Sequence, residues 1–263
     1  MTIAAGFRCR DGVLILVDSQ HSVGNSKYQG PKLWEIEWGK SSVVVTAAGD
    51  DSSILEAVEH LRRKIDGFSE NVGFQAIDEA IRSCKLGRGL VLLVGAKLEH
   101  ESTARLLRVE EDNEGTTRVN QLPQSGLKSY TFSGTYVAEA MCNEMFDWLF
   151  SSAVPVLQMK ELAAHALGRI CEYAQWCSWP IQSAYLLDEG ARIEYLDDFK
   201  LPEYAPKYRG YLCGVQHLLG QAIRACVDFT NPNDAECERH IQDLADSLRE
   251  MRRHSKSDWM IIN

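Results

Sequence analysis

The segment that decides the fold reads Thr2-Ile-Ala-Ala-Gly-Phe-Arg-Cys-Arg-Asp-Gly-Val-Leu-Ile-Leu-Val-Asp18. Two apolar runs, residues 3–9 and 13–18, flank the short sequence Arg10-Asp11-Gly12. An Asp-Gly turn between two such runs is a strong signal for a β-hairpin. We therefore expect a hairpin whose two ends, Thr2 and Asp18, lie together at its open end.

Apolar periodicity predicts the elements that follow this hairpin. Alternating or continuous apolar runs predict strands, and apolar stripes that recur every three or four residues predict amphipathic helices. The expected strands are residues 33–37, 42–47, 90–96, 103–110, 116–121, 181–187 and 191–196, and the expected helical stripes are 54–65, 74–84, 137–150 and 162–173. The order along the chain is strands, two helices, strands, two helices and strands.

This order predicts an α/β fold. Each sheet has helices to cover only one of its faces, so two sheets packed face to face with helix layers outside would bury both apolar faces. We expect a four-layer α/β/β/α sandwich over residues 1–196. Pro202 and Pro206 then mark a break, and two further apolar stripes, 211–222 and 241–251, predict a C-terminal helical extension over residues 197–263.

Composition limits the partners of the chain. Its 263 residues carry 28 Lys and Arg against 37 Asp and Glu, a formal charge of −9, with no basic run. This charge gives no electrostatic reason to expect nucleic acid or an anionic membrane as a partner. Because we find no signal peptide, no apolar run of transmembrane length and no CxxC among the eight cysteines, we expect free thiols and a cytoplasmic location.

Thr2 is the first candidate for chemistry. A threonine hydroxyl is a poor nucleophile unless a base lies beside it, and an α-amino group with a pKa of about 7.7–8.0 is such a base when it belongs to the same residue. This arrangement requires removal of Met1, which a small second residue permits. An ammonium from Lys32 would favour the alkoxide of Thr2, and the carboxylate of Asp18 would hold that ammonium in place.

The N-terminal segment resembles the start of a proteasome β subunit, and also the peptidase subunit of the bacterial ATP-dependent protease that shares its fold. In that family a mature Thr, an Asp sixteen positions later, a Thr or Ser, and a Gly recur in this order. Thr2, Asp18, Ser22 and Gly24 take those places here. The resemblance covers residues 2–196 and implies an α/β/β/α sandwich of the N-terminal-nucleophile hydrolase type.

Three further segments carry this resemblance. Lys32-Leu33-Trp34-Glu35-Ile36 resembles the family's catalytic-lysine strand, Thr46-Ala47-Ala48-Gly49 resembles the turn that supplies an oxyanion-hole N–H, and Phe132-Ser133-Gly134 resembles the Ser-Gly that opens the third helix. The implied catalytic residues are Thr2, Asp18, Lys32, Gly49 and Ser133, where Gly49 N–H binds the oxyanion and Ser133 organises the threonine amine. The implied substrate-binding residues are His21, Ser22, Ala47 and Asp51.

The resemblance implies a threonine-type amide or peptide hydrolase. Its expected partners are a peptide or protein substrate, a homo-oligomeric ring of the same chain and an ATPase. No metal or organic cofactor is needed, and the motifs GxSxG, HExxH and the phosphate loop are absent from the sequence. These absences leave no signal for the usual competing hydrolase or nucleotide-binding classes.

One position departs from the family pattern. The family often carries an Asp-x-x-Ser after the fourth helix, and the corresponding sequence here is Gln175-Trp176-Cys177-Ser178. A glutamine supplies no negative charge beside the threonine amine. Two alternatives therefore stay open: a catalytically silent scaffold subunit, and a small-molecule amidase or acylase that uses the same groups.

Overall fold

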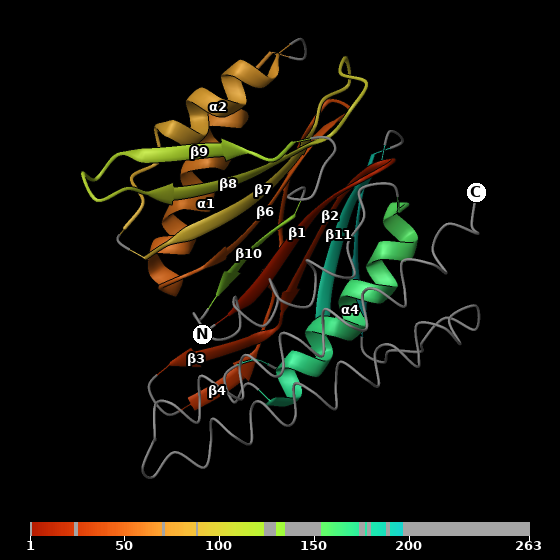
Figure 1. The fold of residues 1–263 in the computed structure, drawn as a ribbon. Coiled ribbons are helices and arrows are strands. Elements are labelled where there is room, and N and C mark those ends of the chain that lie inside the picture. The colour runs from red at the N-terminus through yellow and green to blue at the C-terminus, as the bar shows by residue number, and fades with distance from the viewer. Residues whose placement is uncertain are drawn as a thin grey trace, which may run out of the picture. The chain divides into compact units, whose positions relative to one another are not determined.

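The computed structural model describes residues 2–23, 26–69, 72–87, 89–123, 130–134, 154–173, 177, 180–187 and 190–196. The chain divides into two compact units, Met1–Lys200 and Leu201–Asn263, and every described residue belongs to the first (Figure 1). The predicted helix at 137–150 and the predicted extension at 197–263 lie outside the described residues. The predicted domain boundary after residue 196 therefore stays a prediction.

The first sheet is built around the hairpin that the sequence predicts. Strands β1 (Ile3–Cys9) and β2 (Gly12–Asp18) pair antiparallel, with Ala4 opposite Val17. Strand β10 (Tyr130–Gly134) pairs with β1, while β11 (Ile181–Leu187) pairs with β2 and with β12 (Gly190–Leu196). The order β10-β1-β2-β11-β12 places the hairpin at the centre of a five-stranded sheet. Every residue of β1 and β2 is buried, in agreement with their continuous apolar sequence.

The second sheet is an antiparallel meander. Its strands follow chain order: β5 (Trp34–Trp38), β6 (Ser41–Ala48), β7 (Val91–Lys97), β8 (Arg105–Glu111) and β9 (Thr117–Gln121). All five predicted strands in this part of the chain are confirmed within two residues at each end. A third sheet of two strands, β3 (Gln20–Val23) and β4 (Ser26–Gln29), was not predicted, because its sequence is mostly polar and gives no apolar alternation.

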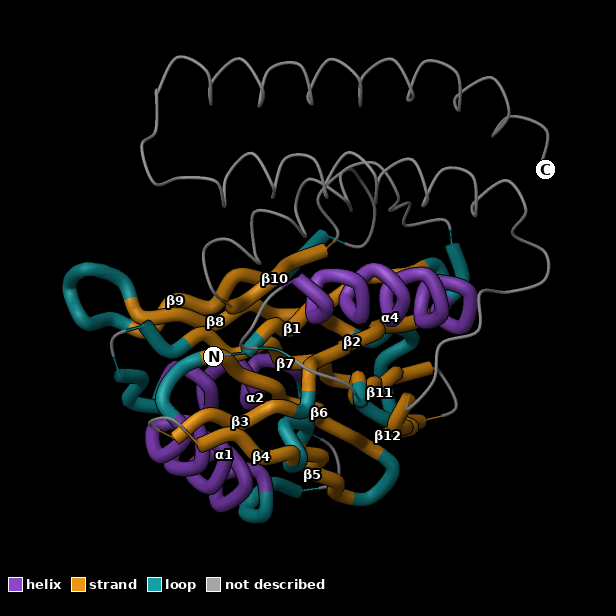
Figure 2. Tube along the Cα trace, turned by 90° about the horizontal axis from the view of Figure 1, so that it is seen from below, coloured by secondary structure: helices purple, strands orange, loops and turns teal. Residues whose placement is uncertain are grey.

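Helices cover the outer faces of the two large sheets. The predicted helices α1 (Asp51–Ile65) and α2 (Phe74–Arg82) lie on the second sheet, and α4 (Val156–Tyr173) lies along β2 and β11 of the first (Figures 1 and 2). Asp50 caps the N-terminus of helix α1, and its carboxylate accepts the backbone N–H of Ser53 at 3.1 Å. This cap fixes where the chain leaves β6 and turns into the helix.

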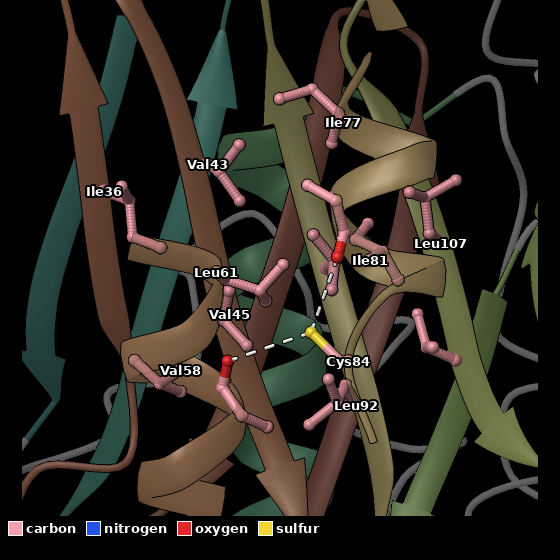
Figure 3. Packing of buried hydrophobic residues seen from close by; sticks show 14 of the residues in the cluster. Ile36, Val43, Val45, Val58, Leu61, Ile77, Ile81, Cys84, Leu92 and Leu107 are labelled. Carbon is pink, nitrogen blue, oxygen red and sulfur yellow. Dashed lines mark hydrogen bonds between the residues drawn. The ribbon is translucent and has the colours of Figure 1, made fainter. Parts of the chain in front are cut away.

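Two apolar clusters hold these layers together. The helix-covered cluster lies between α1, α2 and the second sheet and includes Ile36, Val43, Val45, Val58, Leu61, Ile77, Ile81, Cys84, Leu92 and Leu107 (Figure 3). The inter-sheet cluster joins the two large sheets and contains Ala4, Val13, Ile15, Val17, Leu33, Val44, Leu93, Ala104, Leu106, Leu122, Ala184 and Leu186. Burial of these side chains is the main source of stability of the described unit.

Gly95 of β7 lies at a tight contact between the two large sheets. A Cβ atom there would lie 2.6 Å from Leu186 Cδ1 and 3.1 Å from Ile15 Cδ1, both in the first sheet. Since Leu186 and Ile15 are fully buried, neither side chain has free space into which to move. The absence of a side chain at residue 95 therefore leaves the room that Leu186 and Ile15 occupy between the sheets.

The predicted four-layer α/β/β/α sandwich is wrong for the described chain. The described residues form mostly antiparallel β structure in three sheets, with few helices. The prediction assumed two helices on each outer face, but only α4 is described on the first sheet, and it did not foresee the β3–β4 sheet. The sequence pattern predicted helix layers as well as sheets. In the described residues, most elements are strands that pair with one another, and few are helices.

Candidate active site

The hairpin places Thr2 and Asp18 together, as the sequence predicts. The Asp18 carboxylate accepts the N–H of Ile3 at 2.9 Å and the N–H of Gln20 at 3.0 Å. The first bond ties the end of β2 to the start of β1, and the second ties it to the start of β3, so that both carboxylate oxygens are held. The backbone of residues 2 and 3 is therefore positioned by the same side chain that faces Lys32.

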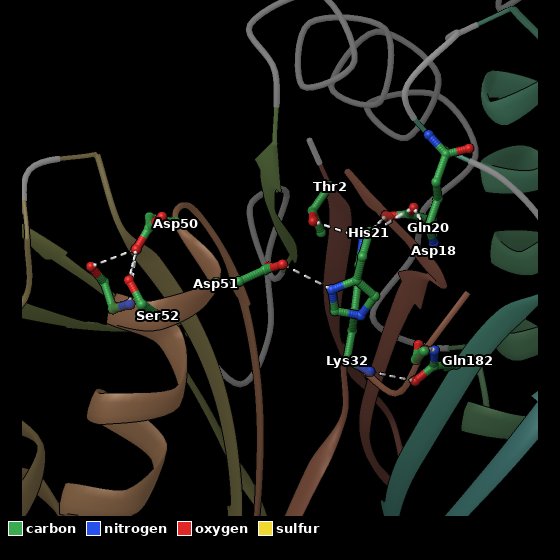
Figure 4. Close-up of polar contacts among 11 residues, drawn as sticks. Thr2, Asp18, Gln20, His21, Lys32, Asp50, Asp51, Ser52 and Gln182 are labelled. Carbon is green, nitrogen blue, oxygen red and sulfur yellow. Dashed lines mark hydrogen bonds and ion pairs between the residues drawn. The ribbon is translucent and has the colours of Figure 1, made fainter. Parts of the chain in front are cut away.

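Lys32 reaches this pair from the connection between β4 and β5. Its Nζ lies 2.8 Å from Thr2 Oγ1 and 3.1 and 3.2 Å from the two oxygens of Asp18 (Figure 4). All three residues are buried, with exposed fractions of 8% for Thr2, 0% for Asp18 and 3% for Lys32. We call Thr2, Asp18, Lys32 and the adjoining Gln182 the polar site.

The charges of the polar site balance each other. Burial raises the pKa of the Asp18 carboxyl above its usual range, and the Lys32 ammonium, with the N–H groups of Ile3 and Gln20, opposes that rise. A buried ion pair is stable only when its remaining hydrogen bonds are also made. Here the carboxylate has both N–H donors and the ammonium, so the geometry allows a charged group to lie against the Thr2 hydroxyl.

Gln182 of β11 is a part of the polar site that sequence reasoning missed. It is fully buried, and its Oε1 accepts the backbone N–H of Lys32 at 2.8 Å (Figure 4). The signal was present in the sequence, since Gln182 and Ser183 are polar residues inside the apolar run 181–187. A buried polar residue in a strand needs a partner, and that partner was not identifiable before the strand order was known.

Ser133 and Gly134 of β10 lie beside the start of β1. Ser133 is opposite Ala4 and Gly134 is opposite Ile3 in the strand register. A Cβ at Gly134 would lie 2.5 Å from the Thr2 carbonyl oxygen, so only glycine allows this approach. Ser133 is 1% exposed, and its Oγ has no hydrogen-bond partner among the described residues, so the structure does not join it to Thr2.

Gly49 and Ala47 lie at the end of β6 in the second sheet. Gly49 has φ +153°, and a Cβ there would lie 2.8 Å from Leu90 Cδ1, which explains the glycine. Ala47 is buried in the helix-covered cluster, on the side of β6 that faces α1. Within the described chain, neither residue makes a hydrogen bond to Thr2, and Ala47 is placed as a core residue.

His21 and Asp51 form a contact between the β3–β4 hairpin and the start of α1. His21 Nδ1 lies 3.2 Å from Asp51 Oδ2 (Figure 4). The His21 ring also stacks on Tyr28 with ring centroids 4.9 Å apart. The structure thus brings together two of the four predicted substrate-binding residues. Ser22 pairs with Lys27 in the hairpin backbone, and its side chain, like Gly24 and Gln175, lies outside the described residues.

The described part of the chain contains no group of three or more His, Cys, Asp or Glu arranged to hold a metal ion. None of its helices combines the length and the apolar sequence that a membrane crossing requires.

Comparison with known proteins identifies the fold. The sequence matches no protein-family model and no curated protein. Anbu from Hyphomicrobium sp. strain MC1 is similar in structure, with a TM-score of 0.59 at 14% identity over 88% of this chain and 99% of that chain. This chain has the Anbu fold. Anbu (ancestral beta-subunit) from Yersinia bercovieri gives a TM-score of 0.60 at 16% identity over the same shares of the two chains.

A third similar structure is the helical assembly of the Anbu complex from Pseudomonas aeruginosa, with a TM-score of 0.59 at 16% identity over 84% of this chain and 96% of that chain. These findings correct the resemblance drawn from the sequence. We expected a proteasome β subunit or the peptidase subunit of the bacterial ATP-dependent protease, and the similar structures are Anbu proteins instead.

Proposed function

We propose that this chain is a threonine-type amide or peptide hydrolase whose nucleophile is the Thr2 hydroxyl. One observation carries the proposal: Lys32 Nζ lies 2.8 Å from Thr2 Oγ1 and 3.1 Å from Asp18 in a buried site. A structural ion pair does not need a hydroxyl as third partner. An ammonium held against a hydroxyl stabilises the alkoxide that forms during attack.

The reaction uses the Thr2 hydroxyl and, after Met1 is removed, the free Thr2 amine. The amine accepts the hydroxyl proton as Oγ1 attacks the substrate carbonyl and a new C–O bond forms. The C–N bond of the substrate then breaks, and the same proton passes to the leaving amine. Water hydrolyses the resulting ester on Thr2 and restores the hydroxyl.

Each neighbouring residue has a defined role in this proposal. Lys32 stabilises the alkoxide and lowers the pKa of the Thr2 amine, because two positive charges close together disfavour protonation. Asp18 orients Lys32. Gly49 N–H is the proposed oxyanion donor, and Ser133 is the proposed partner of the Thr2 amine. His21, Ser22, Ala47 and Asp51 remain the proposed substrate-binding set, although Ala47 faces the core.

The proposal includes a homo-oligomer acting on peptides or proteins. The Pseudomonas aeruginosa Anbu complex is described as a helical assembly, which supports association between copies of a chain with this fold. Confinement of the nucleophile inside an assembly would protect other proteins in the cell. The closed ring, the ATPase partner and the cytoplasmic location predicted from the sequence stay predictions.

Intact-mass analysis of the purified chain tests the proposal directly. We expect loss of Met1 and formation of one covalent adduct with a peptide epoxyketone, a reagent that needs both a hydroxyl and a free amine on one residue. Thr2→Ala should form no adduct and hydrolyse no amide. Thr117→Ala is the control, because its hydroxyl donates to the Cys84 carbonyl at 2.9 Å in the second sheet.

The same experiment separates the alternatives. An adduct with turnover of peptides supports a peptidase, and an adduct with turnover of small amides alone supports an amidase or acylase. Retention of Met1 in the working protein, or full amide hydrolysis by Thr2→Ala, would contradict the mechanism. A mature chain with a free Thr2 but neither adduct nor turnover would favour the silent scaffold.

A further inference from the structure

We propose that Gln182 is a positioning residue that holds the backbone of Lys32 so that its ammonium meets Thr2. Its Oε1 accepts the Lys32 N–H at 2.8 Å, and its Nε2 donates to the Gly30 carbonyl at 2.7 Å. The side chain is fully buried, and its residue lies one position from the end of the β2–β11 pairing. The proposal rests on the proposed function, because it concerns the residue that activates Thr2.

The two contacts fix the orientation of the Gln182 amide. Lys32 N–H is only a donor, so the amide oxygen must face it, and the Gly30 carbonyl is only an acceptor, so the amide nitrogen must face it. A carboxamide is uncharged and offers both functions from a single planar group. Replacement by an apolar side chain would leave both backbone groups without this partner.

Among the described residues, the backbone of the segment that Gln182 holds has few other hydrogen-bond partners. Residues 30–33 connect β4 to β5 and belong to no strand, so a sheet ladder does not satisfy them. Pro31 has no N–H to donate. Gly30 N–H donates to the Ser19 carbonyl at 3.0 Å, which ties the segment to the end of β2. The Gln182 amide therefore supplies this segment with one acceptor and one donor, as the backbone of a neighbouring strand would in a sheet.

The strand register connects this support to the chemistry. In the pairing of β11 with β2, Ile181 is opposite Asp18 and Gln182 is opposite Val17. Strand β11 thus holds the end of β2, where Asp18 lies, and holds the Lys32 backbone through the next residue. Because the Lys32 ammonium contacts Thr2 and Asp18 together, a shift of its backbone would break both contacts.

Gln182→Met tests the proposal, since methionine has similar length and volume but no amide. We expect epoxyketone labelling of Thr2 to slow by about 10- to 100-fold, as for a misplaced catalytic group. We also expect the pH of half-maximal labelling to rise, because a displaced ammonium no longer opposes protonation of the amine. Ser183→Ala is the matched control: it is the next residue, it is equally buried, and its Oγ has no partner in the described part of the chain.

The shift in pH separates positioning from a general loss of stability, which would lower the amount of folded protein without moving the profile. Gln182→Glu is the second variant and covers the case in which Gln182→Met does not fold. It keeps an acceptor for Lys32 N–H and loses the donor to Gly30, so we expect labelling between the wild-type and Gln182→Met rates. Wild-type labelling with a wild-type pH profile in both folded variants would overturn the proposal.

Hydrogen exchange of the Lys32 amide, followed by NMR, tests the contact independently of any activity. We expect exchange at least about tenfold faster in Gln182→Met than in wild type, and near-wild-type protection in Gln182→Glu and Ser183→Ala. Unchanged Lys32 protection in Gln182→Met would also overturn the proposal. If Thr2 of the wild type forms no adduct, the proposed function fails, and the exchange result alone decides whether Gln182 positions Lys32.

Discussion

The polar site and the helix-covered cluster are equally buried but depend on different physics. In the helix-covered cluster, Leu61, Ile65 and their neighbours contribute area and shape, and a loss at one position is graded by the volume removed. In the polar site, Asp18 and Lys32 depend on each other's charge and on the N–H groups around them. We therefore expect loss of one side chain in the helix-covered cluster to lower stability in proportion to the volume removed. Loss of one group in the polar site should instead abolish the function of the whole site.

Replacement of Lys32 should give the largest effect and is the sharpest test of this difference. We expect Lys32→Ala to reduce amide hydrolysis by about 10³-fold or more, nearly as much as Thr2→Ala, since residues that act as a unit fail together. Lys27→Ala, at an exposed lysine on β4, should stay within about twofold of wild type. Rates of peptide hydrolysis measure this, and equal tolerance at the two lysines would show that the polar site is only structural.

Leu61→Ala tests the other side of the comparison. Leu61 is fully buried and lies in the helix-covered cluster (Figure 3). We expect a loss of about 2–5 kcal/mol in the free energy of unfolding, from lost burial and the cavity left behind. Denaturant titration measures the loss, and epoxyketone labelling of the folded fraction should stay near wild type. A large drop in labelling would mean that the two regions are coupled.

Cys84 gives the helix-covered cluster one titratable group. Burial raises the pKa of its thiol from 9.0 to about 11, and its Sγ lies 3.6 Å from the Ala80 carbonyl oxygen (Figure 3). Because the unfolded thiol loses its proton first, this residue's contribution to stability is complete below pH 9 and falls between pH 9 and 11. We expect the free energy of unfolding of Cys84→Ala to fall less than that of wild type across this range. Parallel slopes for the two proteins would contradict the assignment.

The His21–Asp51 contact should give the smallest effect. The Asp51 side chain is 43% exposed, so solvent weakens the 3.2 Å contact with His21. A double-mutant cycle with His21→Ala and Asp51→Ala should give a coupling of about 0.5 kcal/mol in the free energy of unfolding at pH 6. A coupling free energy several times larger would show that His21 and Asp51 depend on each other as strongly as the charges of the polar site do.

The sequence predicted more of the local structure than of the layers and the site. The Asp11-Gly12 turn and the apolar runs beside it gave the central hairpin, and the stripes from Ile54 to Ile65 gave α1, because these signals are local. Thr2, Asp18 and Lys32 were also predicted together, through chemistry and a motif. These three residues meet because the β1–β2 hairpin brings Thr2 and Asp18 together and the connection between β4 and β5 carries Lys32 to the open end of that hairpin.

The rest depended on contacts between distant parts of the chain. Gln182 lies 150 residues from Lys32, and only the pairing of β11 with β2 brings them together. The β3–β4 sheet has a polar sequence with no periodic signal. Ala47 was predicted beside the substrate, yet the alternation along β6 turns its side chain toward α1. Which face of a strand meets which layer is not contained in the strand's own sequence.

Gly95 lies where the backbone of β7 packs directly against side chains of the first sheet. The two large sheets meet there with no side chain between the β7 backbone and the side chains of Ile15 and Leu186. A methyl group added at residue 95 would collide with these two buried side chains, which would have to move for it to fit. Ile15 lies on β2 three residues before Asp18, so a side chain added at residue 95 would press on the strand that carries the carboxylate of the polar site.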